Sequence, residues 1–285
     1  MKISPFLDLM CPLDGNALDG NGATTTWRCD AGHSFDIARE GYIHLLPVQN
    51  KRSRNPGDSK EMVAARRRFL SAGMYQPIAA AVNKVAMNGL PNARPARCLD
   101  AGCGEGYYLR QLTSASAGED GPGIELLGLD ISKFAVLAAA RQDKRPTWVV
   151  GSNANLPVKT GSIDRVLCIF GFPVYAEFAR VLAPEGQLVQ VDAGPDHLRE
   201  LRQVIYPILK PERGSLAMVP DGFVRLSTDT ISYSIDLVGA ELIADLLAMT
   251  PHLFRASAEG RAKVAALTAL SVTVDVRLKA FVREF

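Results

Sequence analysis

"LDAGCGEGYY", residues 99–108, is an apolar run that ends in an acid and then places three glycines at alternate positions. The run Arg97–Ala101 predicts a short buried strand, so Gly102, Gly104 and Gly106 would follow its carboxyl end, where parallel sheets bind ligands. Glycine permits positive φ and lets a ligand approach the main chain without an intervening Cβ. The spacing G-x-G-x-G differs from the G-x-G-x-x-G of dinucleotide sites. We therefore expect a ligand-binding loop, with a tight turn that binds nothing as the alternative.

Beyond residue 96, strand-like and helix-like patterns alternate, which is typical of a parallel sheet covered on both faces. The tail is different, because two long stretches with period-2 alternation, "FVRLSTDTISYSIDL" and "SVTVDVRLKAF", predict antiparallel strands at the sheet edge. The expected fold class is α/β, a doubly wound sheet with an antiparallel C-terminal edge. The expected strands are Arg97–Ala101, Ile124–Asp130, Thr147–Val150, Ile163–Phe170 and Gln187–Asp192; the expected helices are Tyr107–Ala115, Lys133–Gln142, Pro173–Leu182 and Pro195–Ile205.

The composition is that of an ordinary globular protein, with 47% hydrophobic and 22% charged residues in a chain of 285. A net charge of +2 means that any nucleic-acid affinity has to come from local clusters of Lys and Arg. The five cysteines are an odd number, which argues against a disulfide framework. We see neither a signal peptide nor a membrane span in the sequence, and expect a cytoplasmic location.

A second carboxylate, Asp130, ends the next predicted strand 24 residues after Gly106, where an acid can accept hydrogen bonds from a ribose diol. Nicotinamide enzymes share such features. Combined with Asp100, the "GSNANLP" segment and the β-rich tail, however, they resemble the class I S-adenosylmethionine-dependent methyltransferases, which have a Rossmann-like fold. The resemblance implies that the glycine loop, with Tyr107, wraps the cofactor and that Asp130 holds its ribose. Asn153 or Asn155 would lie near the adenine, or could be a solvated loop amide.

The N-terminal region carries a possible metal site. Cys11, Asp14, Cys29 and His33 form a C-x2-D…C-x3-H pattern, and structural zinc usually takes four Cys or His ligands at such short pair spacings. Aspartate can complete a zinc tetrahedron but is a harder ligand than thiolate. The alternative is a module held by its own hydrogen bonds and packing.

The chain also resembles one particular family, the RlmA-type 23S rRNA (guanine-N1)-methyltransferases. The similarity rests on "CPL" at residues 11–13, the C-x3-H and following segment over residues 29–77, the glycine loop and "MTP" at residues 249–251. Members pair a zinc-ribbon-like module with a methyltransferase domain and modify a guanine in a 23S rRNA hairpin loop. Asp14 stands where the family has a second cysteine. The implied organisation is an RNA-recognition module at 1–46, a basic linker and helix at 47–92, and the methyltransferase domain at 93–285.

A basic stretch joins the predicted module to the predicted catalytic domain. We favour phosphate contacts for it, which would position RNA without reading its sequence, although a solvated helix face is the ordinary interpretation of such a run. Ribosomal hairpins are commonly recognised by stacking of loop bases on aromatic rings. The cations are Lys51, Arg52, Arg54, Lys60, Arg66, Arg67 and Arg68. The possible stacking residues, any of which could equally pack in a small core, are Trp27, Phe35, Tyr42 and Tyr75.

The substrate pocket should be lined by the segments that follow the fourth and fifth strands. Phe170 or Phe172 could stack on a flipped guanine, or belong to the core. Asp192 or His197 could accept the N1 proton, or His197 could line the following helix. Two other functions fit the fold: a small-molecule methyltransferase, which would have no evident use for residues 1–70, and a non-catalytic RNA-binding protein. A homodimer and binding to an assembling large ribosomal subunit are further expectations.

Overall fold

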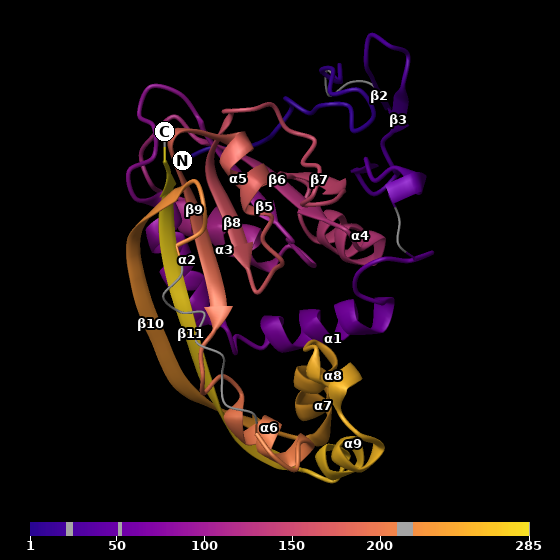
Figure 1. Ribbon diagram of the computed structural model, residues 1–285, viewed down its shortest axis with the longest axis vertical. Helices are drawn as coiled ribbons and strands as arrows, with labels where there is room; N and C mark the ends of the chain where they lie inside the picture. The colour runs from indigo at the N-terminus through magenta and orange to yellow at the C-terminus, as the bar shows by residue number, and fades with distance from the viewer. Residues whose placement is uncertain (21–24, 51–52, 210–218, 285) are drawn as a thin grey trace.

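The computed structural model describes residues 1–20, 25–50, 53–209 and 219–284. Its centre is a parallel sheet of five strands, β5 to β9, and the predicted doubly wound α/β class is confirmed. Each of these strands except β9 is almost entirely buried, because helices cover both faces of the sheet (Figure 1). The strands are β5 (Ala96–Ala101), β6 (Ile124–Asp130), β7 (Thr147–Val150), β8 (Ile163–Ile169) and β9 (Leu182–Ala193).

Helices α3 (Tyr107–Ser116) and α4 (Lys133–Gln142) follow the prediction closely. Two later helices are shorter than predicted, α5 (Tyr175–Val181) and α6 (Arg199–Ile205). The prediction for α6 was wrong at its start because Leu198 adopts a left-handed φ of 52°, which a continuous helix cannot contain.

The antiparallel edge is confirmed. β10 (Phe223–Val238) and β11 (Ala269–Arg283) form a long ribbon that pairs through β11 with β9 (Figure 1). Between these two strands, α7 (Ala240–Ala248), α8 (His252–Arg255) and α9 (Ala258–Ala265) form a small helical group. None of the described helices combines the length and apolar character that a membrane crossing requires.

The N-terminal region contributes two strands to the main sheet, which the sequence did not predict. β1 (Ile3–Pro5) pairs with the first half of β6, and β4 (Tyr42–His44) pairs with β7. Only β2 (Thr26–Arg28) and β3 (Ser34–Asp36) form a separate hairpin. The short 3-10 helix Val48–Asn50 follows β4.

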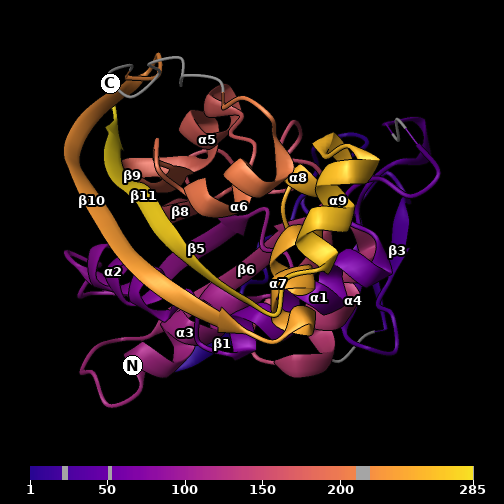
Figure 2. The same ribbon diagram turned by 90° about the horizontal axis from the view of Figure 1, so that it is seen from below.

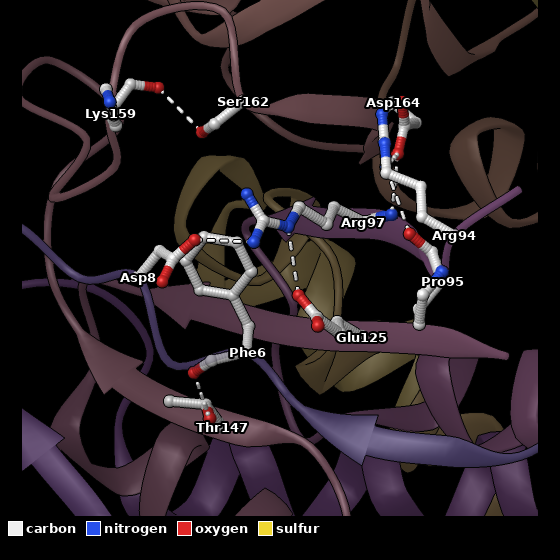
Figure 3. Close-up of polar contacts among 10 residues, drawn as sticks. All are labelled: Phe6, Asp8, Arg94, Pro95, Arg97, Glu125, Thr147, Lys159, Ser162 and Asp164. Carbon is white, nitrogen blue, oxygen red and sulfur yellow. Dashed lines mark hydrogen bonds and ion pairs between the residues drawn. The ribbon is translucent and has the colours of Figure 1, made fainter. Parts of the chain in front are cut away.

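Arg97 on β5 attaches the first residues of the chain to this sheet (Figure 3). Its guanidinium pairs with Asp8 and Glu125 and lies 5.6 Å from the centre of the Phe6 ring. The Phe6 carbonyl accepts a hydrogen bond of 2.7 Å from Thr147 at the start of β7. The N-terminal segment is thus fixed to three neighbouring strands.

Helix α1 (Lys60–Ser71) lies beneath the carboxyl ends of the parallel strands, next to α7 (Figures 1 and 2). Ser59 caps its first turn by accepting a hydrogen bond from the Met62 amide. Arg68 makes a bidentate ion pair with Asp245 of α7. Helix α2 (Gln76–Met87) follows and packs against α3. Helix α1 also brings Arg66 close to Gly104 of the glycine loop.

Candidate functional site

The three glycines of the loop have different roles. All have positive φ, of 101° at Gly102, 54° at Gly104 and 83° at Gly106. A Cβ added to Gly102 would meet no atom within 4 Å, so space beside this residue is open. A Cβ on Gly106 would lie 2.6 Å from the Trp148 ring. Gly102 therefore leaves room for a ligand, whereas Gly106 is required by packing.

Asp130 at the end of β6 fixes the loop. One of its carboxylate oxygens accepts the Gly104 amide at 2.9 Å and the other accepts the Ser132 amide at 2.7 Å. Each oxygen has a second lone pair, so the same carboxylate can also accept hydrogen bonds from the two hydroxyls of a ribose. Burial raises the pKa of Asp130, and the two amide bonds partly oppose that rise.

Asp100 is a buried carboxyl for which the described residues provide no hydrogen-bond partner at either oxygen. Burial, and then the charge of Asp130, raises its pKa to about 8. A buried polar group without a partner costs free energy, and a strongly perturbed acid in a crevice is typical of a functional site. The open space at Gly102, the free lone pairs of Asp130 and this unpartnered acid together fit a polar cofactor such as S-adenosylmethionine.

The other predicted cofactor residues lie in different surroundings. The Asn153 amide donates to the Phe172 carbonyl at 3.2 Å, and its own buried oxygen has no partner among the described residues. Asn155 donates instead to the Pro12 carbonyl at 3.1 Å, which links this loop to the N-terminal region. Tyr107 is buried at the start of α3 and packs edge-to-face against Tyr108. Asn153 remains a candidate for a cofactor contact, while Asn155 and Tyr107 have structural contacts.

The two aromatic residues predicted to line the substrate pocket, Phe170 and Phe172, both lie in the loop that follows β8. Phe172 is 87% exposed. Phe170 has a left-handed φ of 52°, and its ring stacks on that of His197, with 5.5 Å between the centroids. Phe172 is thus the side chain with a free face for a base.

Both ring nitrogens of His197 are engaged. Nδ1 accepts the Asp275 amide at 3.3 Å and Nε2 lies 3.3 Å from the Tyr75 hydroxyl. Burial lowers the pKa of His197 to about 4, so its ring is neutral at pH 7. These contacts favour the alternative structural role for His197.

Asp192 is the better placed of the two predicted proton acceptors. Its side chain is 35% exposed, and it accepts hydrogen bonds from Gln190 at 2.9 and 3.1 Å. The buried Lys279 of β11 donates to it at 3.0 Å, and Tyr175 of α5 donates to Gln190. Gln190 and Lys279 were not predicted, and no local signal reveals Lys279, because it lies 87 positions from Asp192 and meets it only through the pairing of β9 with β11.

The basic stretch is divided between structural and exposed cations. Arg66 pairs with Asp58 and is 24% exposed, whereas Arg68 pairs with Asp245 and keeps 60% of its side chain exposed. Both cations have a carboxylate partner in the protein, and their contact with phosphate stays a prediction. Arg54, Lys60 and Arg67 are exposed. Lys51 and Arg52 lie outside the described residues.

The predicted stacking residues are mostly part of the core. Trp27, Tyr42 and Tyr75 are each at least nine-tenths buried, which favours core packing over stacking on RNA bases for these three. They face inward because they complete the hydrophobic packing of the β2–β3 hairpin, β4 and α2. Phe35 is partly buried against the same core.

The four residues of the C-x2-D…C-x3-H pattern do meet. Their ligand atoms all lie within 4.8 Å of one another, with His33 Nδ1 at 3.0 Å from Asp14, 3.4 Å from Cys29 and 3.5 Å from Cys11. Ligands of a tetrahedral zinc ion lie about 3.3–3.8 Å apart. The three separations from His33 are close to that range, so the cluster is compatible with the ion. The Asn16 amide donates a hydrogen bond to one carboxylate oxygen of Asp14, which lowers the pKa of Asp14. The other carboxylate oxygen of Asp14 faces His33.

Comparisons with known proteins agree with both the N-terminal Cys, Asp and His cluster and the domain that contains the glycine loop. Residues 9–54 match the family model for the N-terminal zinc ribbon of RlmA, and residues 99–190 match a methyltransferase domain. A protein of Micromonospora griseorubida assigned as a 23S rRNA (guanine-N1)-methyltransferase is 34% identical over 95% of both chains. One of Bacillus subtilis with the same assignment is 29% identical over 95% of both.

The 23S rRNA (guanine(748)-N1)-methyltransferase of Streptomyces fradiae is 36% identical over 62% of this chain and 60% of its own. The matched methyltransferase domain includes the glycine loop, Asp100 and Asp130, and makes S-adenosylmethionine the cofactor. The Cys, Asp and His cluster lies inside the matched zinc ribbon and is compatible with Zn²⁺. The chain therefore belongs to the RlmA-type family of 23S rRNA (guanine-N1)-methyltransferases and is an S-adenosylmethionine-dependent enzyme.

Proposed function

We propose that this protein transfers a methyl group from S-adenosylmethionine to N1 of a guanine in a hairpin loop of 23S rRNA. The main support is its similarity to rRNA guanine-N1 methyltransferases along 95% of the chain, which includes the region outside the cofactor motifs. The open space beside Gly102 and the unpartnered carboxyl of Asp100 support a cofactor site at the glycine loop.

The chemistry requires a proton acceptor, because guanine N1 carries a proton at neutral pH. Asp192 is our candidate for it: its carboxylate takes the N1 proton as the N1–CH3 bond forms and the S–CH3 bond of the sulfonium breaks, which releases S-adenosylhomocysteine. Phe172 would stack on the base after it leaves the loop. The cofactor supplies the electrophilic methyl group, and the protein aligns the base with it, which can contribute about 7–11 kcal/mol to barrier lowering.

The RNA backbone would be bound by the exposed cations Arg54, Lys60 and Arg67, with Lys51 and Arg52, and positioned by the zinc module. A homodimer is proposed on the long β10 edge, which exposes Val224 and Leu226 and could pair with a second copy. We place the enzyme in the cytoplasm, with naked rRNA or an assembling large subunit as its substrate.

The structure changes how the alternative functions must be tested. β1, β4 and most of α1 lie within residues 1–70, so any methyltransferase built on this sheet would need them. Their presence therefore no longer argues against a small-molecule substrate, and deleting them would damage the fold.

The deciding assay is transfer of labelled methyl to rRNA from a strain that lacks the corresponding enzyme, followed by nucleoside analysis. We expect 1-methylguanosine in 23S rRNA, and a large loss of rate in Phe172→Ala without a change in cofactor affinity. Phe254→Ala, which removes another exposed aromatic ring on α8, is the matched control. Label in another nucleoside, or in small molecules only, would reject the proposal.

A further inference from the structure

Arg66 brings a positive charge to the glycine loop. A Cβ built on Gly104 would lie 3.7 Å from its Nη1 and 3.9 Å from its Cδ, so the side chain passes directly over this residue. The guanidinium also pairs with Asp58 and donates from Nη2 to the Met249 carbonyl at 3.1 Å. Only 24% of the side chain is exposed. Arg66 thus links the glycine loop, α1 and the end of α7.

The order of the strands indicates which part of the cofactor lies there. β5 lies between β6 and β8 in the sheet. If Asp130 at the end of β6 holds the ribose and the methyl group points to the loop after β8, the sulfur lies above the end of β5. The amino-acid arm attached to that sulfur then extends over the glycine loop, beneath Arg66.

We infer that Arg66 binds the α-carboxylate of the methionine arm of S-adenosylmethionine. A guanidinium offers five N–H groups in a planar fork that suits a carboxylate, and such pairs are among the stronger hydrogen-bonded contacts. The inference depends on the cofactor and not on the RNA substrate.

Asp58 has a defined part in this arrangement. Its carbonyl accepts a hydrogen bond from Ser132 Oγ at 2.7 Å, so its main chain is attached to the loop that follows Asp130. Its carboxylate is the resident partner of Arg66 and competes with the carboxylate of the cofactor for the same guanidinium. The main chain can stay in place while Arg66 changes partner.

The test compares two ligands by calorimetry, S-adenosylhomocysteine and 5′-methylthioadenosine, which lacks the amino-acid arm. We expect Arg66→Met to raise the Kd of S-adenosylhomocysteine at least tenfold and to leave that of 5′-methylthioadenosine unchanged. Arg66→Lys should recover part of the loss. Lys84→Met, which removes an exposed charge from the neighbouring helix α2, is the matched control and should change neither Kd.

Asp58→Asn separates binding from a structural role. Competition predicts equal or tighter binding of S-adenosylhomocysteine in this variant, whereas a purely structural Arg66–Asp58 pair predicts a loss similar to that of Arg66→Met. Equal weakening of both ligands in Arg66→Met, or no change in either, would overturn the inference. Because no RNA is present, these outcomes are independent of the proposed rRNA substrate.

Discussion

The Asp130 carboxylate accepts a hydrogen bond of 2.9 Å from the Gly104 amide, so the acid that we assign to the ribose also fixes the shape of the glycine loop. In this assignment one residue would serve the cofactor twice, by direct contact and by fixing the loop. This double role makes the loop sensitive to changes at the end of the neighbouring strand.

Replacing Asp130 by Ala should therefore weaken cofactor binding by roughly 10- to 100-fold, since hydrogen bonds to a charged group are each worth about 1.5–3 kcal/mol. Calorimetric titration with S-adenosylmethionine measures the effect. Asp229→Ala removes an exposed acid from β10 and should leave the Kd unchanged. An unaltered Kd in Asp130→Ala would remove this residue from the site.

Gly102 in the glycine loop and Gly161 in the turn before β8 form a matched pair of substitution sites. Both have positive φ, of 101° and 69°, and a Cβ on either would meet no atom within 4 Å. Each Gly→Ala change should cost about 1–3 kcal/mol of folding stability through backbone strain. Only Gly102→Ala should also raise the Kd for the cofactor, because its Cβ would enter the ligand space. Equal cofactor affinities in the two variants would show that the open space beside Gly102 is not used.

The parts of the fold that were predicted correctly are those with local signals. β5, the glycine loop and α3 are adjacent in sequence, and the apolar run followed by glycines is sufficient to identify them. β1 and β4 were missed because strands of three residues show no periodicity, and their partners are over a hundred residues away.

Within the site, the sequence predicted which residues carry the chemistry better than it predicted which side chains they contact. The metal cluster was predicted as a set because its ligands are close in sequence. The contacts of Arg66 with Gly104 and of Lys279 with Asp192 depend on the packing of α1 and the pairing of β11, which no short motif encodes. A charged run also looks the same in sequence whether its members face solvent or pair with acids.

Asp100 should make the stability of the cofactor-free protein depend on pH. Its pKa is raised from 3.8 to about 8 by folding, so between these values the folded protein holds a proton that the unfolded chain has lost. Stability from this group is therefore full below about pH 4 and decreases as pH rises to about 8. Urea unfolding of Asp100→Asn and the native protein should show the variant gaining relative stability between pH 5 and 7.5, by at most about 1.4 kcal/mol per pH unit. A difference that is constant with pH would contradict the assignment.

Asp14 should set the affinity of the metal site. Asp14→Cys supplies a softer ligand and should tighten zinc binding at least tenfold, whereas Asp14→Ala removes a ligand and should weaken it. Competition with a chromogenic chelator gives the Kd of each variant, and native mass spectrometry gives the zinc content. Asp30→Ala, which removes an exposed acid beside Cys29, is the control. Equal zinc affinity in all variants would exclude Asp14 as a ligand.

Lys279 should affect catalysis through Asp192. It is buried and donates a 3.0 Å hydrogen bond to a carboxylate that is partly exposed, so it orients that carboxylate without reaching the base itself. We expect Lys279→Met to lower kcat for RNA methylation at least tenfold, with little change in the KM for S-adenosylmethionine, and Lys279→Arg to restore part of the rate. Lys263→Met breaks an exposed ion pair with Glu259 on α9 and should leave kcat unchanged. If Lys279→Met folds and retains full kcat, Asp192 does not need this partner. If the variant loses cofactor affinity and keeps kcat, Lys279 and Asp192 act on cofactor binding and not on the guanine base.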